Sequence, residues 1–249
     1  MKTPAPSHSH ASESPTRRQM LGLMAAAPLA YGVIASAAMA GAPTSTSGRM
    51  PTALITGASS GFGFVTAQPL ARNGIHVIGS MRNMTTKNAS SVAAFRQLAR
   101  EEELRLDVGE IDIDSDDSVQ SGMAEAFSLA ERIDVLFNNA GINIPGPIEL
   151  SMEAARQRFE TNVFGQLRML RAIAPHMRRH RNGLFIQMSS GLGHLVQPTS
   201  GLYSATKFAQ EAMFESAAYE LHPFGVEVAI IQPSDYQNKI KENSHRYLN

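Results

Sequence analysis

The sequence predicts a single α/β domain, built as a doubly wound parallel sheet with helices on both faces, in three layers. Short apolar runs alternate with longer amphipathic stretches from about residue 50 onward, and strands that alternate with helices pair in parallel through right-handed crossovers. The first apolar run also leads into a glycine-rich turn that opens a helix, as in nucleotide-binding sheets of this class. Strands are expected at 52–56, 75–80, 106–113, 133–138, 183–189 and 226–231.

Composition limits the classes of protein to consider. The chain has 249 residues, of which 43% are hydrophobic and 18% charged, as in one ordinary globular domain. Its formal net charge of zero supplies no field that would attract nucleic acid or an anionic membrane. The chain contains no cysteine, which excludes disulfides, thiolate nucleophiles and cysteine-ligated metals. We therefore expect a small-molecule partner and chemistry performed by oxygen and nitrogen groups.

The first 40 residues have the pattern of an export signal. Arg17 and Arg18 directly precede an apolar run that ends in the small-x-small arrangement Ala38-Met39-Ala40. This predicts a twin-arginine signal over residues 1–40, cleaved after Ala40, and a periplasmic or secreted protein. A retained membrane anchor is the alternative, since about twenty apolar residues span a bilayer. Alanine and glycine dominate the run where an anchor would favour leucine and isoleucine, which argues for cleavage.

A short lead-in separates this signal from the domain. Residues 41–49 (GAPTSTSGR) consist of small and polar residues and read as a flexible linker. The folded domain is then expected over residues 50–249.

The glycine-rich turn after the first strand favours a bound nucleotide. Glycines allow the tight turn and let backbone amides approach a pyrophosphate, while the following helix presents its positive amino terminus. A turn that merely joins a strand to a helix is the alternative, but this one lies at the first crossover, where nucleotides bind. The residues expected to hold the phosphates are Gly57, Ser59, Ser60, Gly61, Phe62 and Gly63.

The end of the second strand predicts the choice of nucleotide. A carboxylate there would bind the ribose 2′-hydroxyl and repel a 2′-phosphate, but Met81 and Arg82 occupy this segment. The guanidinium of Arg82 can pair with a phosphate through its fork of donors. We therefore expect NADP as the cofactor, with NAD as the alternative. For Arg82 itself, the alternative is an ordinary exposed arginine that binds no nucleotide.

Tyr203 and Lys207 form the strongest candidate for catalysis. They begin a helical stretch and lie four residues apart, so they share one helix face. A nearby ammonium favours the phenolate, which moves a tyrosine toward a pKa useful for acid/base work. A solvated pair at helical spacing is the alternative.

Together these segments resemble the short-chain dehydrogenase/reductase family. The chain contains its TGxxxGxG turn at 56–63, its NNAG motif at 138–141 and its YxxxK motif at 203–207. The resemblance covers residues 52 to about 240. It implies a Rossmann fold, a nicotinamide cofactor, and reversible hydride transfer between nicotinamide C4 and a carbonyl or secondary alcohol carbon, without a metal.

The resemblance also implies roles for the catalytic residues. Tyr203 exchanges the proton, and Lys207 tunes that tyrosine and grips the nicotinamide ribose. Ser190 polarises the substrate oxygen, and we prefer it to Ser189 because it stands thirteen residues before Tyr203. Asn162 bends its helix slightly and holds a water that joins Lys207 to bulk solvent.

Further cofactor contacts follow from the same resemblance. Asp112 matches the acidic residue that contacts the adenine amine. The remaining residues expected at the cofactor are Ile113, Asn139, Ala140, Gly141, Pro233 and Ser234.

The carboxyl-terminal part departs from the family pattern. Ser234 replaces a glycine, and Asn238 stands where threonine is expected. The chain ends at Asn249, where relatives continue with a substrate lid and a seventh strand, so we expect an unprotected sheet edge. A nucleotide-binding protein with weak or no catalysis is therefore the alternative function. Epimerisation on the same scaffold is disfavoured by the glycine spacing.

The sequence also allows expectations about the roles of three histidines and about the oligomeric state. His176 and His180 lie among arginines before Gly183, where the helix dipole explains cations better than a metal or nucleic acid does. His194 lies between Ser190 and Tyr203, where it either faces substrate or is an exposed loop residue. The resemblance implies a homodimer or homotetramer, formed through the helices near 151–179 and 203–222.

Overall fold

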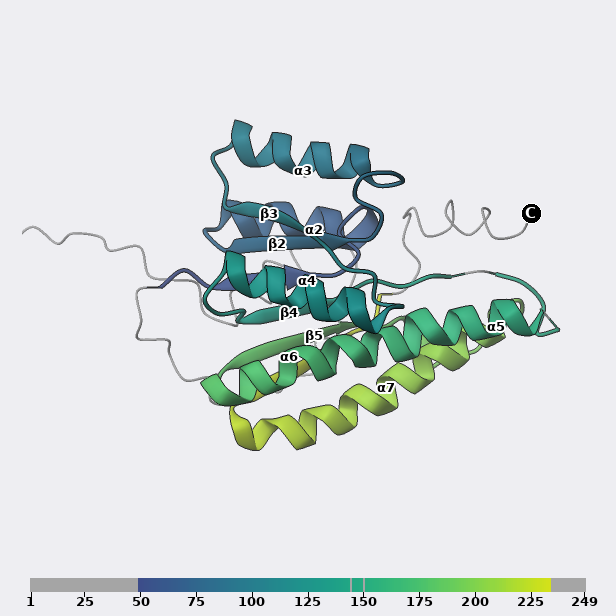
Figure 1. Ribbon diagram of the computed structural model, residues 1–249. Helices are drawn as coiled ribbons and strands as arrows, with labels where there is room; N and C mark the ends of the chain where they lie inside the picture. Colours follow the sequence, from purple (N-terminus) through teal and green to yellow (C-terminus); the bar gives the residue numbers. More distant parts are fainter. Residues whose placement is uncertain (1–48, 144, 150, 234–249) are drawn as a thin grey trace, which may run out of the picture.

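The computed structural model describes residues 49–143, 145–149 and 151–233, which form one α/β domain around a six-stranded parallel sheet (Figure 1). The strands are β1 (Thr52–Ile55), β2 (His76–Met81), β3 (Leu106–Glu110), β4 (Val135–Asn138), β5 (Gly183–Met188) and β6 (Val226–Ile231). Their spatial order is β3-β2-β1-β4-β5-β6, so the direction of winding reverses between β1 and β4. In such sheets the ligand crevice lies outside the carboxyl ends of the strands at that reversal. The predicted doubly wound fold is confirmed.

The helices cover both faces of the sheet. They are α2 (Gly61–Arg72), α3 (Ala89–Glu101), α4 (Asp116–Leu129), α5 (Met152–Phe159), α6 (Gln166–His180) and α7 (Gly201–Leu221), with a π-helical turn η1 (Glu160–Gly165) and short 3₁₀ turns η2 (Gly191–Gly193) and η3 (His222–Phe224). One apolar core joins the sheet to α2 and α3, and a second joins it to α4, α6 and α7. Neighbouring residues of β1 serve the two faces alternately, Leu54 in the second core and Ile55 in the first.

Two element boundaries differ from the sequence expectation. The third strand ends at Glu110, so Asp112 and Ile113 lie in the loop that follows it. The single helix expected from about residue 151 is interrupted by η1, which contains Asn162. The Asn162 side chain donates to and accepts from the backbone of Ile142, at 2.8 Å in each case. A side chain committed in this way accompanies a local widening of the helix, as π-helical turns at functional sites often show.

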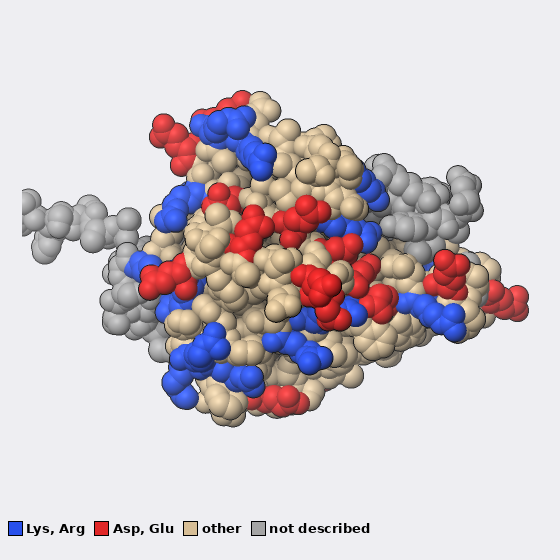
Figure 2. All heavy atoms as spheres, viewed as in Figure 1, with Lys and Arg blue, Asp and Glu red and all other residues tan. Residues whose placement is uncertain are grey.

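The outer parts of the chain lie outside the described residues. These include the expected export signal, the lead-in up to residue 48, and the carboxyl-terminal positions Ser234 and Asn238. Arg49, the last residue of the lead-in, is described and pairs with Asp134. In the described part, β6 forms an edge of the sheet, and its residues after Val226 are only half-buried. No helix within that part is long and apolar enough to cross a membrane. Acidic and basic side chains intermingle over the face shown in Figure 2.

Candidate active site

The glycine-rich turn requires glycine at two positions for different reasons. Gly57 has φ +65°, and a Cβ there would lie 2.8 Å from the Cα of Ala140. At Gly63 a Cβ would lie 2.6 Å from the Gly57 carbonyl oxygen and 2.7 Å from Nδ2 of Asn139. Both contacts are closer than side chains allow, so the turn can pack against β4 and the start of α2 only without side chains. The turn therefore lies directly against the loop after β4, with no side chain between them.

Asn139 and Thr56 fasten the turn to the end of β4. The Thr56 hydroxyl oxygen accepts the N–H groups of Asn139 at 2.9 Å and Ala140 at 3.0 Å. In return, Nδ2 of Asn139 donates to the Thr56 carbonyl oxygen at 2.8 Å. The carboxyl ends of β1 and β4 are thus joined at the point where the strand order reverses.

A cavity of about 400 Å³ opens at this edge of the sheet. Eleven of the residues predicted to hold the cofactor line it: Gly57, Ser59, Ser60, Gly61, Phe62, Arg82, Asp112, Ile113, Asn139, Ala140 and Gly141. Gly63 does not line the cavity but packs behind the turn. Ile142 and Asn143 also line the cavity and belong to the apolar loop 142–148, which the sequence favours as a pocket wall. Sequence reasoning missed the wall residues Lys87, Asn88, Ser90, Ser91, Ile111 and Thr161. Lys87 follows Arg82 by five residues in the same loop, and this second cation was the sequence signal that could have identified it as a wall residue.

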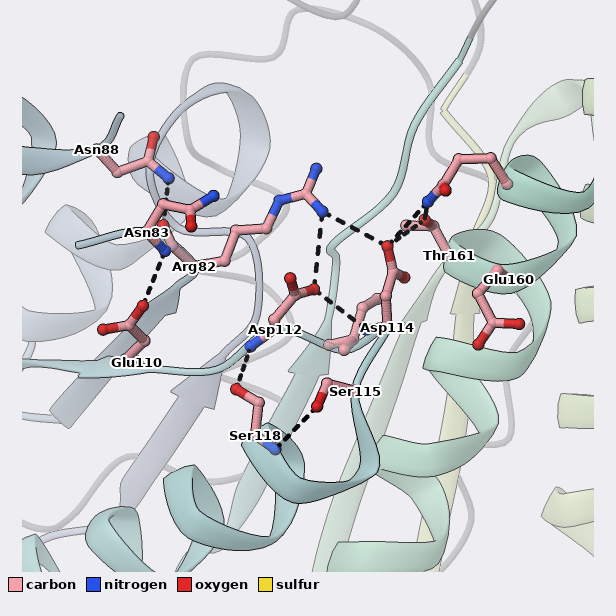
Figure 3. A network of polar contacts seen from close by, with 12 residues as sticks. Arg82, Asn83, Asn88, Glu110, Asp112, Asp114, Ser115, Ser118, Glu160 and Thr161 are labelled. Carbon is pink, nitrogen blue, oxygen red and sulfur yellow. Dashed lines mark hydrogen bonds and ion pairs between the residues drawn. The ribbon is translucent and has the colours of Figure 1, made fainter. Parts of the chain in front are cut away.

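Arg82 is paired with two carboxylates across the cavity wall (Figure 3). Its Nη1 lies 3.4 Å from Oδ2 of Asp114 and 3.7 Å from Oδ1 of Asp112. The same Asp114 oxygen accepts hydrogen bonds from Thr161 at 2.9 Å and Gln157 at 3.0 Å. Burial raises the pKa of Asp114, although the Thr161 hydrogen bond opposes this shift. This network connects the end of β2 to the π-helical turn beside Asn162.

Tyr203 and Ser190 meet near the start of α7. Tyr203 is buried, and the Ser190 side chain lies close enough to its hydroxyl to affect its pKa. Burial raises the pKa of Tyr203 to about 12, and the Ser190 side chain lowers it by a smaller amount. The neighbouring Ser189 hydroxyl is buried without a hydrogen-bond partner among the described residues. The structure therefore brings Ser190, rather than Ser189, to the tyrosine.

Lys207 lies behind Tyr203 on the same helix face. Its Nζ is 5.6 Å from the centre of the Tyr203 ring and donates to the Met188 carbonyl oxygen at 2.9 Å. It also donates to Oε1 of Gln210 at 2.9 Å. Burial lowers the pKa of Lys207 to about 7, opposed by the negative charge of Glu211. Sequence reasoning missed Gln210. Its amide side chain stands about one helical turn after Lys207, and this spacing could have indicated a contact.

Asn162 reaches this group of residues from η1. Its side chain is wholly buried and donates to the Thr206 hydroxyl at 3.1 Å. Its main-chain carbonyl oxygen accepts a hydrogen bond from Nε2 of Gln210. The four predicted catalytic residues therefore lie together and are joined through Asn162 to Ile142 on the cavity wall. None of the four lines the cavity itself, although Tyr203 and Lys207 were also predicted to contact the cofactor.

Residues 51–247 match the family profile described as short chain dehydrogenase. The chain belongs to this family. It is 38% identical over 191 residues to a 3-ketodihydrosphingosine reductase from Bacteroides thetaiotaomicron, a match that covers 76% of this chain and 65% of that protein. The chain thus spans less than two thirds of the length of this relative.

Solved structures of other short-chain dehydrogenases share the fold. A Burkholderia phymatum short chain dehydrogenase/reductase in complex with NAD matches with a TM-score of 0.73 and 26% identity, over 80% of this chain and 70% of that one. An alcohol dehydrogenase from Thermococcus sibiricus complexed with 5-hydroxy-NADP matches with a TM-score of 0.70 and 26% identity, over 77% and 79%.

Three further positions considered in the sequence analysis lie outside the cavity, namely His176, His194 and Pro233. His176 is buried beside Phe127, with ring centres 4.5 Å apart, and its Nε2 accepts the N–H of Ile133 at 3.3 Å. It is a packing residue of the core, which the helix-dipole interpretation did not anticipate. His194 is an exposed residue of the loop after Ser190, and its Nε2 lies 3.5 Å from Oε2 of Glu211 on α7. The Pro233 carbonyl oxygen accepts the N–H of Gly191 at 2.9 Å. Within the described ranges, no three potential metal ligands lie together.

Proposed function

We propose that the protein is an NADP-dependent oxidoreductase that transfers a hydride between a nicotinamide cofactor and a carbonyl or secondary alcohol carbon. The observation that carries this proposal is the proximity of Ser190, Tyr203 and Lys207. Asn162 joins this group to Ile142 on the wall of the cavity that the glycine turn also lines. Family membership supports it. A nicotinamide cofactor, when bound, supplies or accepts the hydride.

The cavity fits a dinucleotide in shape and chemistry. Side chains are excluded at Gly57 and Gly63, which leaves room for a pyrophosphate against the backbone. The amino terminus of α2 faces this space, where its partial positive charge favours anions. Asp112 and Ile113 would hold the adenine, and Asn139 to Gly141 would border the nicotinamide half. Pro233 and Ser234 belong to the same proposed nicotinamide end.

Tyr203 would exchange the proton with the substrate oxygen. At neutral pH a phenol with a pKa of about 12 carries its proton, so it can donate to a carbonyl oxygen as hydride reaches the carbon. In the reverse direction the Lys207 ammonium favours the phenolate that accepts the alcohol proton. The Ser190 hydroxyl, which lies near the Tyr203 hydroxyl, would polarise the same substrate oxygen. Asn162 would hold the backbone of Ile142 at the cavity wall.

The preference for NADP rests on charge at the adenosine end. The end of β2 carries no carboxylate, while Arg82 and Lys87 both line the cavity. A 2′-phosphate would draw Arg82 from its present carboxylate partners through charge-assisted hydrogen bonds. The solved relatives include one bound to NAD and one bound to a modified NADP, so this choice has to come from the chain's own residues.

We also propose export and self-association. The twin arginines before the apolar run support export, and replacing Arg17 and Arg18 by lysine should retain the chain in the cytoplasm. Phe164 of η1 and Phe208 of α7 are large apolar residues that are 50% and 43% exposed. Their exposure supports a dimer or tetramer through these helices, which sedimentation equilibrium would measure.

Turnover by the full chain tests the proposed function. NADPH oxidation should be measured by nicotinamide absorbance with a panel of ketones and aldehydes, and NADPH binding by titration calorimetry. We expect both binding and turnover. Binding without turnover on any carbonyl would contradict the oxidoreductase proposal and favour a nucleotide-binding role. If neither NADPH nor NADH binds, the proposed cofactor site itself is contradicted.

A further inference from the structure

Gln210 lies entirely inside the protein, between two members of the candidate active site. It belongs to α7 and has 0% of its surface exposed. Its Oε1 accepts a hydrogen bond from Lys207 Nζ at 2.9 Å, and its Nε2 donates to the main-chain carbonyl oxygen of Asn162. Both ends of this buried amide are therefore used to join α7 to η1.

The acceptor end matters because the Lys207 ammonium is buried. A buried ammonium is costly unless hydrogen-bond acceptors replace water. In the described part of the chain, Lys207 Nζ has two such acceptors, the Met188 carbonyl and Gln210 Oε1. Gln210 therefore supplies half of the hydrogen bonds that stabilise this charge.

The donor end matters because η1 is a π-helical turn. The changed hydrogen-bond pattern of such a turn displaces main-chain carbonyls from their usual α-helical partners. Gln210 Nε2 satisfies the Asn162 carbonyl, while the Asn162 side chain holds the backbone of Ile142 at the cavity wall. Hydrogen bonds thus run from the cavity wall through Asn162 and Gln210 to Lys207.

Few other charged or titratable groups act on Lys207. Tyr203 lies on one side, with its ring centre 5.6 Å from Nζ. Glu211 follows on α7, and its charge raises the lysine pKa against the effect of burial. His194, from the loop after Ser190, lies 3.5 Å from Glu211. Gln210 is the neutral side chain among these neighbours that contacts the ammonium directly.

We propose that Gln210 is a positioning residue of the active site, whose amide fixes the Lys207 ammonium relative to Asn162 and beneath Tyr203. Its effect on turnover rests on the proposed function, but its effect on Lys207 does not. Because an amide has a fixed donor end and a fixed acceptor end, this bridge orients the ammonium and does not pass protons onward.

The ionisation of Lys207 can be measured without any turnover. The chain has five lysines, Lys2, Lys87, Lys207, Lys239 and Lys241, so ¹³C NMR of protein labelled at the lysine ε-carbon gives few signals. The Lys207 signal is the one that disappears in Lys207→Arg. Titration of the full chain with pH then gives the pKa of Lys207, and exposed Lys87 serves as the internal reference.

Two variants separate the functions of the two amide ends. Gln210→Met keeps the length of the side chain but removes both hydrogen bonds, so the pKa of Lys207 should fall by at least about one unit. Gln210→Glu keeps an acceptor and adds a negative charge, so that pKa should rise. Ser204→Ala is the matched control, because the Ser204 hydroxyl is also buried on α7 but has no hydrogen-bond partner in the described part. It should leave Lys207 unchanged.

The result expected in kinetics is a loss of kcat in Gln210→Met together with a displaced pH profile, while the Kd for NADPH changes less. Equal Lys207 titrations in the unmodified chain, Gln210→Met and Gln210→Glu would overturn the proposal. If Gln210→Met does not fold, the direction of the Lys207 pKa shift in Gln210→Glu tests the proposal instead. If the full chain shows no turnover at all, the proposed function fails, while the NMR titration still tests whether Gln210 stabilises the Lys207 ammonium.

Discussion

Nη1 of Arg82 lies 3.4 Å from Oδ2 of Asp114, so the cation expected to bind a 2′-phosphate already has an anionic partner. Asp112 adds a second carboxylate at 3.7 Å. A 2′-phosphate brought to Arg82 must therefore compete with two negative charges, and under the proposed function the balance between them sets the relative affinity for NADP and NAD.

Asp114→Asn should strengthen NADPH binding. The amide can still accept from Thr161 and Gln157 but no longer competes electrostatically for Arg82. Ion pairs that are partly exposed contribute up to about 1 kcal/mol, so we expect the Kd for NADPH to fall by about threefold to fivefold, with little change for NADH. Calorimetric titration of both nucleotides measures this. Asp117→Asn, at an exposed carboxylate in the first turn of α4, is the charge control. An equal change for NADPH and NADH would refute this role of Asp114.

Arg82→Ser should weaken NADPH binding selectively. Losing a charge-assisted phosphate contact costs about 1.5–3 kcal/mol, which corresponds to about a tenfold to hundredfold rise in Kd. NADH lacks the 2′-phosphate, so its Kd should remain nearly the same. Arg96→Ser removes an exposed arginine of α3 that does not line the cavity and provides the comparison. A parallel loss for both nucleotides would contradict the NADP assignment.

Gly63→Ala should damage both stability and nucleotide binding. The added Cβ would lie 2.6 Å from the Gly57 carbonyl oxygen and would press on the Asn139 amide. Overpacking of this kind costs about 1–3 kcal/mol in the free energy of unfolding. Gly109→Ala is the control, since the nearest atom to its Cβ would be 4.0 Å away. Denaturant unfolding and NADPH titration measure the two effects, and a Gly63→Ala protein equal to Gly109→Ala in both would show that the close approach is unnecessary.

His176 should make stability depend on pH between about 4 and 6.5. Burial lowers its pKa in the folded state from 6.5 to about 4, with His180 adding to this shift. Between these values the unfolded chain binds the proton more strongly, so the stability that His176 provides is full above pH 6.5 and is lost as the pH falls toward 4. The loss amounts to at most about 3 kcal/mol.

Replacing this histidine tests the assignment. In His176→Gln the free energy of unfolding should vary less over the same pH range, as denaturant titrations at several pH values would show. His222→Gln, at an exposed histidine, should retain the full dependence. The assignment fails if both variants follow the same pH curve as the unmodified protein.

Sequence patterns were sufficient for the sheet and most of the cavity wall, because both depend on short-range signals. The alternation of apolar runs placed all six strands to within a few residues, and the glycine spacing placed the turn between β1 and α2 that lines the cavity. The pairing of Arg82 with Asp114 depends on how two loops approach in space, and no spacing in the chain encodes it. Gln210 was missed for a similar reason: its partner Asn162 is 48 residues away, on a π-helical turn that local propensity does not reveal.

The most direct test of the account is the turnover of Tyr203→Phe. Phenylalanine keeps the ring beside Lys207 but removes the hydroxyl that meets Ser190, so the fold and the cavity should remain intact. We predict that the Kd for NADPH is unchanged, while kcat for carbonyl reduction falls by at least about a hundredfold. Turnover equal to that of the unmodified protein, at the same NADPH affinity, would contradict the assignment of Tyr203 as the proton donor and with it the proposed active site.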